Sequence, residues 1–128
     1  MKMLIGVHPP THGDAFIFGL SVRDDLSAIQ EVMGSCPQDD ILWWELTARD
    51  HLELYAHFKG VERSRVATAV NQMLEYVGLS DEANEPVRNF SGGMKRRLSV
   101  AISAIGSPQI IFLDEPSTGM DPLSRRRV

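Results

Sequence analysis

The amino-acid sequence predicts an α/β fold, in which parallel sheet strands pack with helices and a helical subdomain is inserted between the strands. Short apolar runs at Val32–Cys36 and Ile110–Leu113 are typical of sheet strands. Between these runs, apolar residues recur at intervals of three and four, as they do on one face of a helix. The chain has 128 residues, of which 43% are hydrophobic and 23% charged, which suits a globular domain with a single core.

The N-terminal part predicts a strand, a helix and a second strand. Ala15–Phe18 is a short apolar run that predicts a buried strand. Ser21 can cap a short helix that carries Asp24 and Asp25 in its first turn. The run at Val32–Cys36 then forms the second strand. We therefore expect these elements to form a layered α/β core.

Residues 41–88 predict helices and no strand. Thr47 can cap the first helix, and Gly60 can end it in the left-handed conformation. The apolar positions that share a face are Ala48, Leu52, Tyr55 and Ala56 in the first helix, and Val66, Val70, Met73, Leu74 and Val77 in the second. We assign this stretch to a helical subdomain, with residues 1–40 and 89–128 as pieces of the α/β core.

The C-terminal part predicts a helix and a strand that ends in two acids. Ser91-Gly92-Gly93 opens a helix with an apolar stripe formed by Met94, Leu98, Ala101, Ile102 and Ile105. Ile110–Leu113 consists of large apolar residues and predicts a strand that is covered on both faces of a parallel sheet. Asp114 and Glu115 follow at the carboxyl edge, where ligands bind in such folds.

Two features predict phosphate chemistry at that edge. In nucleotide hydrolysis one acid holds Mg²⁺ and a neighbouring acid orients and deprotonates the attacking water, and we assign Asp114 and Glu115 to these roles in that order. The free N–H groups of a helix that starts with two glycines bind anions, and Ser91 adds a hydroxyl. Taken singly, the acidic pair can also begin a solvated loop, and Ser-Gly-Gly can also be a flexible helix cap.

Gln38 is a third candidate. It lies in the polar run Cys36-Pro37-Gln38-Asp39-Asp40, which leaves a strand and enters the helical segment. From there it can touch both a metal-bound water and whatever packs on the helices. Alternatively, Gln38 is a polar residue of a turn without a role in a site.

Charge and cysteine content exclude several classes of site. Seventeen acidic side chains against thirteen basic ones give a net charge of −4, which argues against broad binding to nucleic acid. Cys36 is the only cysteine, which excludes an intrachain disulfide and a multi-thiolate metal site and fits a reducing compartment. No apolar stretch approaches the ~20 residues that a membrane-spanning helix needs, so we expect no direct insertion of this segment into a membrane.

Three ordered motifs resemble the nucleotide-binding domain of ATP-binding cassette (ABC) transporters. They are Cys36–Gln38, Asn89–Arg97 and Ile110–Pro122. The residues around them, including Trp43–Thr47 and Lys95–Ala101, are most similar to the A subfamily, whose members mostly move lipids. The resemblance implies a partial P-loop NTPase core, ATP and Mg²⁺ as cofactors, and ATP hydrolysis coupled to transmembrane transport.

The resemblance also implies a role for each matching residue. Gln38 is the Q-loop glutamine, with a part in catalysis and at the metal site. Asp114 is the Walker B aspartate of the metal site, and Glu115 is the catalytic base. The residues implied to contact the nucleotide are Ser91, Gly92, Gly93 and Met94 of the signature motif and Asp121 of the D-loop, which spans residues 117–121.

The implied partners are two. A second nucleotide-binding domain forms a head-to-tail dimer, in which ATP lies between the phosphate loop of one cassette and the signature motif of the other. The transmembrane domains of the same transporter dock on the helical subdomain at the cytosolic face of a membrane. Trp43 and Trp44 are candidate contacts there, and their alternative as partly buried packing residues has equal weight.

The sequence departs from the family pattern at three points. The phosphate loop G-x-x-x-x-G-K-[ST] is absent. The family's switch histidine lies downstream of the D-loop, whereas all histidines here lie upstream of it and are expected to be surface or packing residues; they are His8, His12, His51 and His57. Met94 stands where many signature motifs carry Gln.

These departures leave three hypotheses for the chain. We expect an internal piece of a transporter ATPase domain, inactive in isolation. The alternatives are a non-enzymatic truncated remnant and a soluble ABC ATPase that acts on ribosomes or DNA.

Overall fold

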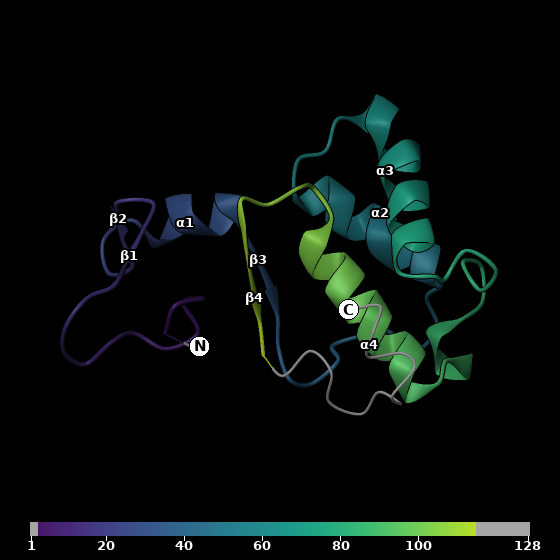
Figure 1. Cartoon of the computed structure of the whole chain (residues 1–128), viewed down its shortest axis with the longest axis horizontal. Helices are drawn as coiled ribbons and strands as arrows, with labels where there is room; N and C mark the ends of the chain where they lie inside the picture. Colours follow the sequence, from purple (N-terminus) through teal and green to yellow (C-terminus); the bar gives the residue numbers. More distant parts are fainter. Residues whose placement is uncertain (1–2, 115–128) are drawn as a thin grey trace.

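The computed structural model of the chain describes residues 3–114. In chain order the elements are β1 (Phe16–Ile17), β2 (Leu20–Ser21), α1 (Leu26–Val32), β3 (Met33–Cys36), α2 (Ala48–Phe58), α3 (Arg63–Tyr76), the 3₁₀ helix η1 (Val87–Asn89), α4 (Gly92–Ala104) and β4 (Ile110–Leu113). Strands β1 and β2 form an antiparallel pair, and β3 and β4 form a parallel pair. The predicted α/β class is therefore confirmed, and Figure 1 shows the parallel pair between α1 and the helices α2 to α4.

The parallel pair brings two distant segments to one edge. Met33 lies opposite Ile110, and Cys36 lies opposite Leu113. All of α2, α3 and α4 fall between the two strands in sequence, which provides the long crossover that a parallel pair requires. The N–H of Asp114 extends the ladder by donating to the carbonyl of Cys36 at 3.0 Å. The segments that follow β3 and β4 therefore leave the sheet side by side.

Helices α2, α3 and α4 enclose the main hydrophobic core. Its buried members are Ala48, Leu52, Ala56, Val66, Val70, Leu74, Val77, Leu79, Ala83, Val87, Phe90, Leu98, Ala101 and Ile105. The predicted start and end of the first helix are confirmed. The Thr47 hydroxyl accepts from the Asp50 N–H while the Asp50 carboxylate accepts from the Thr47 N–H, and Gly60 has a φ of +70°.

Helix α4 packs directly on β3. A Cβ atom placed on Gly34 would lie 1.9 Å from the carbonyl oxygen of Ser103, so a glycine is required for this approach. The predicted apolar stripe of α4 faces the core, with Leu98 and Ala101 fully buried. Met94 and Ile102, which belong to the same predicted stripe, are partly buried at the margin of that core.

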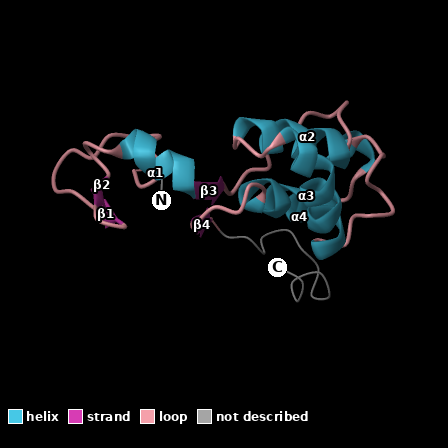
Figure 2. Cartoon of the chain, turned by 90° about the horizontal axis from the view of Figure 1, so that it is seen from above, coloured by secondary structure: helices cyan, strands magenta, loops and turns pink. Residues whose placement is uncertain are grey.

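The predicted buried strand at Ala15–Phe18 is wrong in extent and in burial, since Phe16 is 70% exposed and Phe18 is 63% exposed. Only Phe16 and Ile17 are extended, and they pair with β2 in a hairpin, separate from the β3–β4 pair. Phe18 turns the chain with a φ of +52° and is exposed. Because a short apolar run obtains its burial from neighbouring segments, its local composition does not specify the partner. Figure 2 shows this hairpin and α1 at one end of the molecule and α2 to α4 at the other.

The predicted capping role of Ser21 is also wrong. Ser21 ends β2, and α1 begins only at Leu26. Asp24 and Asp25 precede the helix, whose first turn carries no acid. The Ser21 hydroxyl oxygen accepts from the Asp24 N–H at 3.2 Å, and the Ser21 carbonyl accepts from the Asp25 N–H at 2.8 Å. Ser and Asp residues bond nearby main-chain groups in turns, and here a turn forms in place of the first helical turn.

The strand β4 is confirmed, but its predicted burial on both faces is wrong. Ile111 is 38% exposed and Leu113 is 39% exposed, while Ile110 and Phe112 are partly buried. Among the described strands, β4 has β3 as its neighbour on one side only. Because side chains alternate between the two faces of a strand, one face of β4 meets the small cluster of α1 and the hairpin, and the other is open.

No helix between residues 3 and 114 has both the length and the apolar character needed to cross a membrane.

Candidate functional site

Gln38 and Asp114 line one cavity at the carboxyl edge of β3 and β4. The cavity has a volume of about 260 Å³ and is lined by Ile5, Val7, Ser35, Cys36, Pro37, Gln38, Asp39 and Asp114. Gln38 follows β3 by two residues and Asp114 follows β4 directly. The parallel register of the two strands therefore places these two sequence-predicted candidates together.

A buried arginine joins the two strand ends. Arg96 of α4 is 2% exposed. Its Nη1 donates to the carbonyl of Pro37 at 2.6 Å and to the carbonyl of Gln38 at 3.1 Å. Its Nη2 donates to the carbonyl of Asp114 at 2.5 Å. Nη1 also forms an ion pair with Oδ1 of Asp40 at 3.4 Å. Because these contacts to Gln38 and Asp114 use main-chain oxygens, they do not occupy the two side chains.

Arg96 is a site residue that none of the sequence motifs assigned to a role. A signal was present in the spacing of α4, where Arg96, Ser99 and Ser103 occur at intervals of three and four and are all buried. An arginine on a helix face that is otherwise made of small or apolar side chains needs partners inside the protein, because arginine is almost never fully buried unless it is paired.

The donor atoms at the cavity are oxygens. Burial raises the pKa of the Cys36 thiol, and the nearby Arg96 opposes this rise. Cys36 is therefore a neutral thiol beside the cavity and not a thiolate ligand. Within residues 3–114, no group of three or more His, Cys, Asp or Glu side chains could hold a metal ion. The amide oxygen of Gln38 and the carboxylate of Asp114 suit Mg²⁺, which takes oxygen ligands and keeps several of its waters.

The signature residues lie elsewhere on α4. Ser91 is the N-cap, and its hydroxyl oxygen accepts from the Met94 N–H at 3.3 Å. Ser91 and Gly92 are exposed, and Gly93 and Met94 are partly buried. None of these four residues is among those that line the cavity of Gln38 and Asp114. This exposed helix start can offer N–H groups to an anion that approaches from outside the molecule.

Two predicted site residues, Glu115 and Asp121, lie outside the described residues, and so does the rest of the predicted D-loop. Their roles stay predictions.

The two tryptophans combine packing with exposure. The ring of Trp43 lies 5.6 Å from that of His51 and 6.3 Å from that of Tyr55, yet Trp43 is 46% exposed. Trp44 is 58% exposed, and the Nζ atom of Lys95 lies 4.3 Å from its ring centroid. Both tryptophans therefore pack against neighbouring side chains and are also exposed, so the alternative of packing residues holds in part. Their contact with transmembrane domains stays a prediction.

His51 is a buried residue that holds Trp43 in place. It is fully buried, its Nε2 accepts from the Trp43 N–H at 3.0 Å, and its Nδ1 lies 2.7 Å from the carbonyl of Thr47. This arrangement requires the neutral ring with its proton on Nδ1. Burial lowers the pKa of His51, which favours that neutral form. The expectation that His51 is a packing residue is confirmed.

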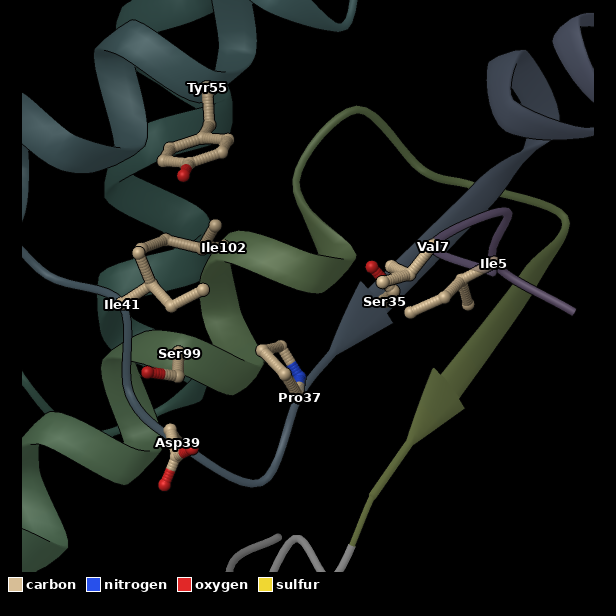
Figure 3. A pocket seen from close by; sticks show the side chains of 9 residues that line it. All are labelled: Ile5, Val7, Ser35, Pro37, Asp39, Ile41, Tyr55, Ser99 and Ile102. Carbon is tan, nitrogen blue, oxygen red and sulfur yellow. The ribbon is translucent and has the colours of Figure 1, made fainter. Parts of the chain in front are cut away.

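A second cavity, of about 290 Å³, opens between β3 and the helices α2 and α4. Its lining residues are Ile5, Val7, Ser35, Pro37, Asp39, Ile41, Tyr55, Ser99 and Ile102, and Figure 3 shows them. It shares five lining residues with the first cavity, so the two are neighbours; they are Ile5, Val7, Ser35, Pro37 and Asp39. The Ser99 hydroxyl is buried and makes no hydrogen bond within the described part of the chain. The second cavity adds Ile41, Tyr55, Ser99 and Ile102 to the shared residues, whereas Gln38 and Asp114 line only the first.

Comparison with known proteins decides the family. The profile of the family described as "ABC transporter" matches residues 1–118. The chain belongs to the ABC transporter family. Its relatives include ABC transporter A family member 8 of Dictyostelium discoideum, which is 52% identical over 126 residues that cover 98% of this chain and 15% of the relative. ABC transporter A family member 10 of Arabidopsis thaliana is 46% identical over 128 residues, which cover 98% of this chain and 14% of the relative. The chain thus spans about 15% of the length of these curated relatives.

Solved structures confirm the predicted ABC ATPase fold. The ATP binding subunit of an ABC transporter matches with a TM-score of 0.83 and 26% identity, over 98% of this chain and 52% of that chain. A dimeric ATP-binding cassette in a post-hydrolysis state, bound to ADP and Pi, matches with a TM-score of 0.86 and 24% identity, over 98% of this chain and 58% of that chain. Together with the A family relatives, these matches confirm the predicted resemblance to the nucleotide-binding domain of A-subfamily ABC transporters.

Proposed function

We propose that this segment serves in an ATPase domain that hydrolyses MgATP and couples hydrolysis to the transport of a lipid across a membrane. The observation that carries the proposal is the shared cavity of Gln38 and Asp114 at the edge of a parallel strand pair. Membership of the ABC transporter family supports the ATPase chemistry. The choice of a lipid as the transported substrate rests on the resemblance to the A subfamily.

The residues of the cavity fit the metal that this chemistry uses. Gln38 and Asp114 would hold Mg²⁺ through oxygen atoms, either directly or through water. When bound, the ion supplies positive charge that stabilises the phosphate oxygens. Glu115, the next residue along the chain, would orient the attacking water and accept its proton. The sequence contains no phosphate loop, so we infer that the isolated chain is inactive and that hydrolysis requires such a loop from outside these 128 residues.

The exposed start of α4 supports a role across an interface. Ser91, Gly92, Gly93 and Met94 lie outside the cavity of Gln38 and Asp114. In a head-to-tail dimer they would therefore contact ATP that the second nucleotide-binding domain holds. Asp121 would contact the nucleotide at the same interface.

The exposed tryptophans support docking of the transmembrane domains. Trp43, Trp44 and Ile41 are exposed and follow Gln38 within a few residues. A partner that covers this surface would therefore lie close to the segment that carries Gln38. We place this contact at the cytosolic face of the membrane.

The catalytic role of Glu115 is testable in the complete ATPase domain that contains this segment. Replacing Glu115 with Gln removes the base but keeps the size of the side chain. ATP binding should therefore persist while turnover falls by roughly 100-fold or more. Equilibrium ATP binding and steady-state phosphate release measure the two effects. The exposed Glu75 of α3 offers a matched control, and Glu75→Gln should leave both unchanged. Unchanged turnover in Glu115→Gln would remove Glu115 from the role of base.

A further inference from the structure

The guanidinium of Arg96 connects three parts of the fold. Arg96 belongs to α4, the carbonyls of Pro37 and Gln38 follow β3, and the carbonyl of Asp114 follows β4. These partners are 18 to 59 residues away in sequence. No other described side chain bonds to the main chain after both strands.

Packing alone does not account for an arginine at this position. Burying a charged group costs free energy unless hydrogen bonds and an opposite charge compensate, and an apolar side chain of similar size would fill the same space without that cost. Arg96 is 2% exposed, and its described acidic partner, Asp40, lies at the limit of a hydrogen bond, 3.4 Å away. Its three shorter bonds within the described residues go to main-chain carbonyls beside the cavity.

We propose that Arg96 is a positioning residue that sets the separation of Gln38 and Asp114 by bonding the carbonyls of both from one rigid, planar group. The proposal rests on the proposed function, because Arg96 would affect ATP hydrolysis only through Gln38 and Asp114, the two residues assigned to MgATP. A guanidinium carries five N–H donors in a fixed fork, so two carbonyls bound to it cannot move independently. A lysine in its place has one nitrogen on a flexible stem and cannot hold both carbonyls in this geometry.

The first test compares Arg96→Lys and Arg96→Met with the unchanged protein, in the complete ATPase domain. A misplacement of about 1 Å can lower a rate by roughly 100-fold, so we expect kcat to fall about 10- to 100-fold in both variants, and less in Arg96→Lys. The KM for MgATP should change by less than about threefold, because binding depends on many other contacts. Arg63→Met, at an exposed position of α3, is the control and should change neither constant. Arg96→Lys keeps the buried charge, so it carries the test if Arg96→Met does not fold.

The second test needs no hydrolysis. Hydrogen exchange in the nucleotide-free domain reports how firmly each segment is held. In Arg96→Lys, peptides that cover residues 37–41 should exchange faster, while peptides from α3 should exchange at the rate of the unchanged protein. Equal exchange at residues 37–41 in both proteins would overturn the proposal.

The third test asks whether Arg96 acts through Gln38. If it does, adding Arg96→Lys to Gln38→Ala should lower kcat by less than about threefold further, because the positioned side chain is already gone. If the loss of kcat in the double variant equals the product of the losses in the two single variants, Arg96 only supports the fold. That result would overturn the proposal. A complete domain that does not hydrolyse ATP would overturn the proposed function, and this inference with it. Normal hydrolysis together with an unaffected Arg96→Lys would overturn this inference alone.

Discussion

The two ends of the molecule differ in the size of their hydrophobic cores. Within residues 3–114, the helices α2, α3 and α4 and their connecting segments share a core of fourteen buried hydrophobic residues, whereas the hairpin, α1 and the start of β3 share a cluster of four. The hairpin adds polar bonds to this small cluster. The Asp14 carboxylate accepts from the Ser21 hydroxyl at 2.6 Å and from the Ala15 N–H at 2.8 Å. The bond from Ser21 and those from main-chain N–H groups lower the pKa of Asp14.

This difference has a consequence for stability. Apolar burial contributes about 25 cal/mol per Å², so the larger cluster contributes most of the free energy of unfolding. Exposed hydrogen bonds such as those of Asp14 contribute little net free energy, because water competes for the same groups. We therefore expect the hairpin and α1 to open more readily than α2 to α4.

The strongest test of this comparison lies where the two ends meet, at the contact of β3 with α4. Gly34→Ala would place a Cβ atom 1.9 Å from the main-chain oxygen of Ser103, which cannot rotate away. We expect the free energy of unfolding to fall by about 3–5 kcal/mol. Urea unfolding of the chain, followed by circular dichroism, measures it. Ser35→Ala, at the exposed neighbouring position of β3, is the control. An unchanged midpoint in Gly34→Ala would show that α4 and β3 do not approach this closely.

The next test compares one residue from each cluster. Leu52 is fully buried in α2, so Leu52→Ala should lower the free energy of unfolding by about 3 kcal/mol. Ile17 is 8% exposed and belongs to the small cluster, so Ile17→Ala should lower the free energy of unfolding by less, about 2 kcal/mol. Because Trp43 contacts His51 of α2 and Trp44 contacts Lys95 of α4, their fluorescence follows the helical end, and circular dichroism follows the whole chain. Equal losses in the two variants would contradict the division into a strongly and a weakly held end.

The smallest expected effect is a dependence on pH. Burial lowers the pKa of His51 from its ordinary 6.5, so the folded protein favours the neutral ring while the unfolded chain binds a proton more readily. This contribution to stability is present above about pH 6.5, and it decreases as the pH falls toward the lowered pKa. The free energy of unfolding, measured at a series of pH values, should show this decrease toward low pH in the unchanged protein and not in His51→Gln. The exposed His57 is the control, and His57→Gln should keep the profile of the unchanged protein.

In the candidate site, local sequence patterns predict some residues and not others. The convergence of Gln38 and Asp114 follows from two apolar runs that end in polar residues, because parallel strands place their carboxyl ends at one edge. Arg96 stands within a run of basic residues, and the spacing that places it on one helix face with Ser99 and Ser103 does not identify its partners. Its partners are main-chain carbonyls, which every residue carries, so no residue type in the sequence marks them.

The sequence by itself determined the α/β class, the helices α2, α3 and α4, the strand at Ile110–Leu113 and the family. Each of these depends on short-range information: the period of apolar residues, a cap such as Thr47, or a motif of adjacent residues. Only the tertiary structure decided the pairing of the N-terminal hairpin, the approach of Gly34 to α4 and the burial of Arg96. These features depend on which distant segments lie side by side, and an apolar run or a basic residue carries no local record of its partner.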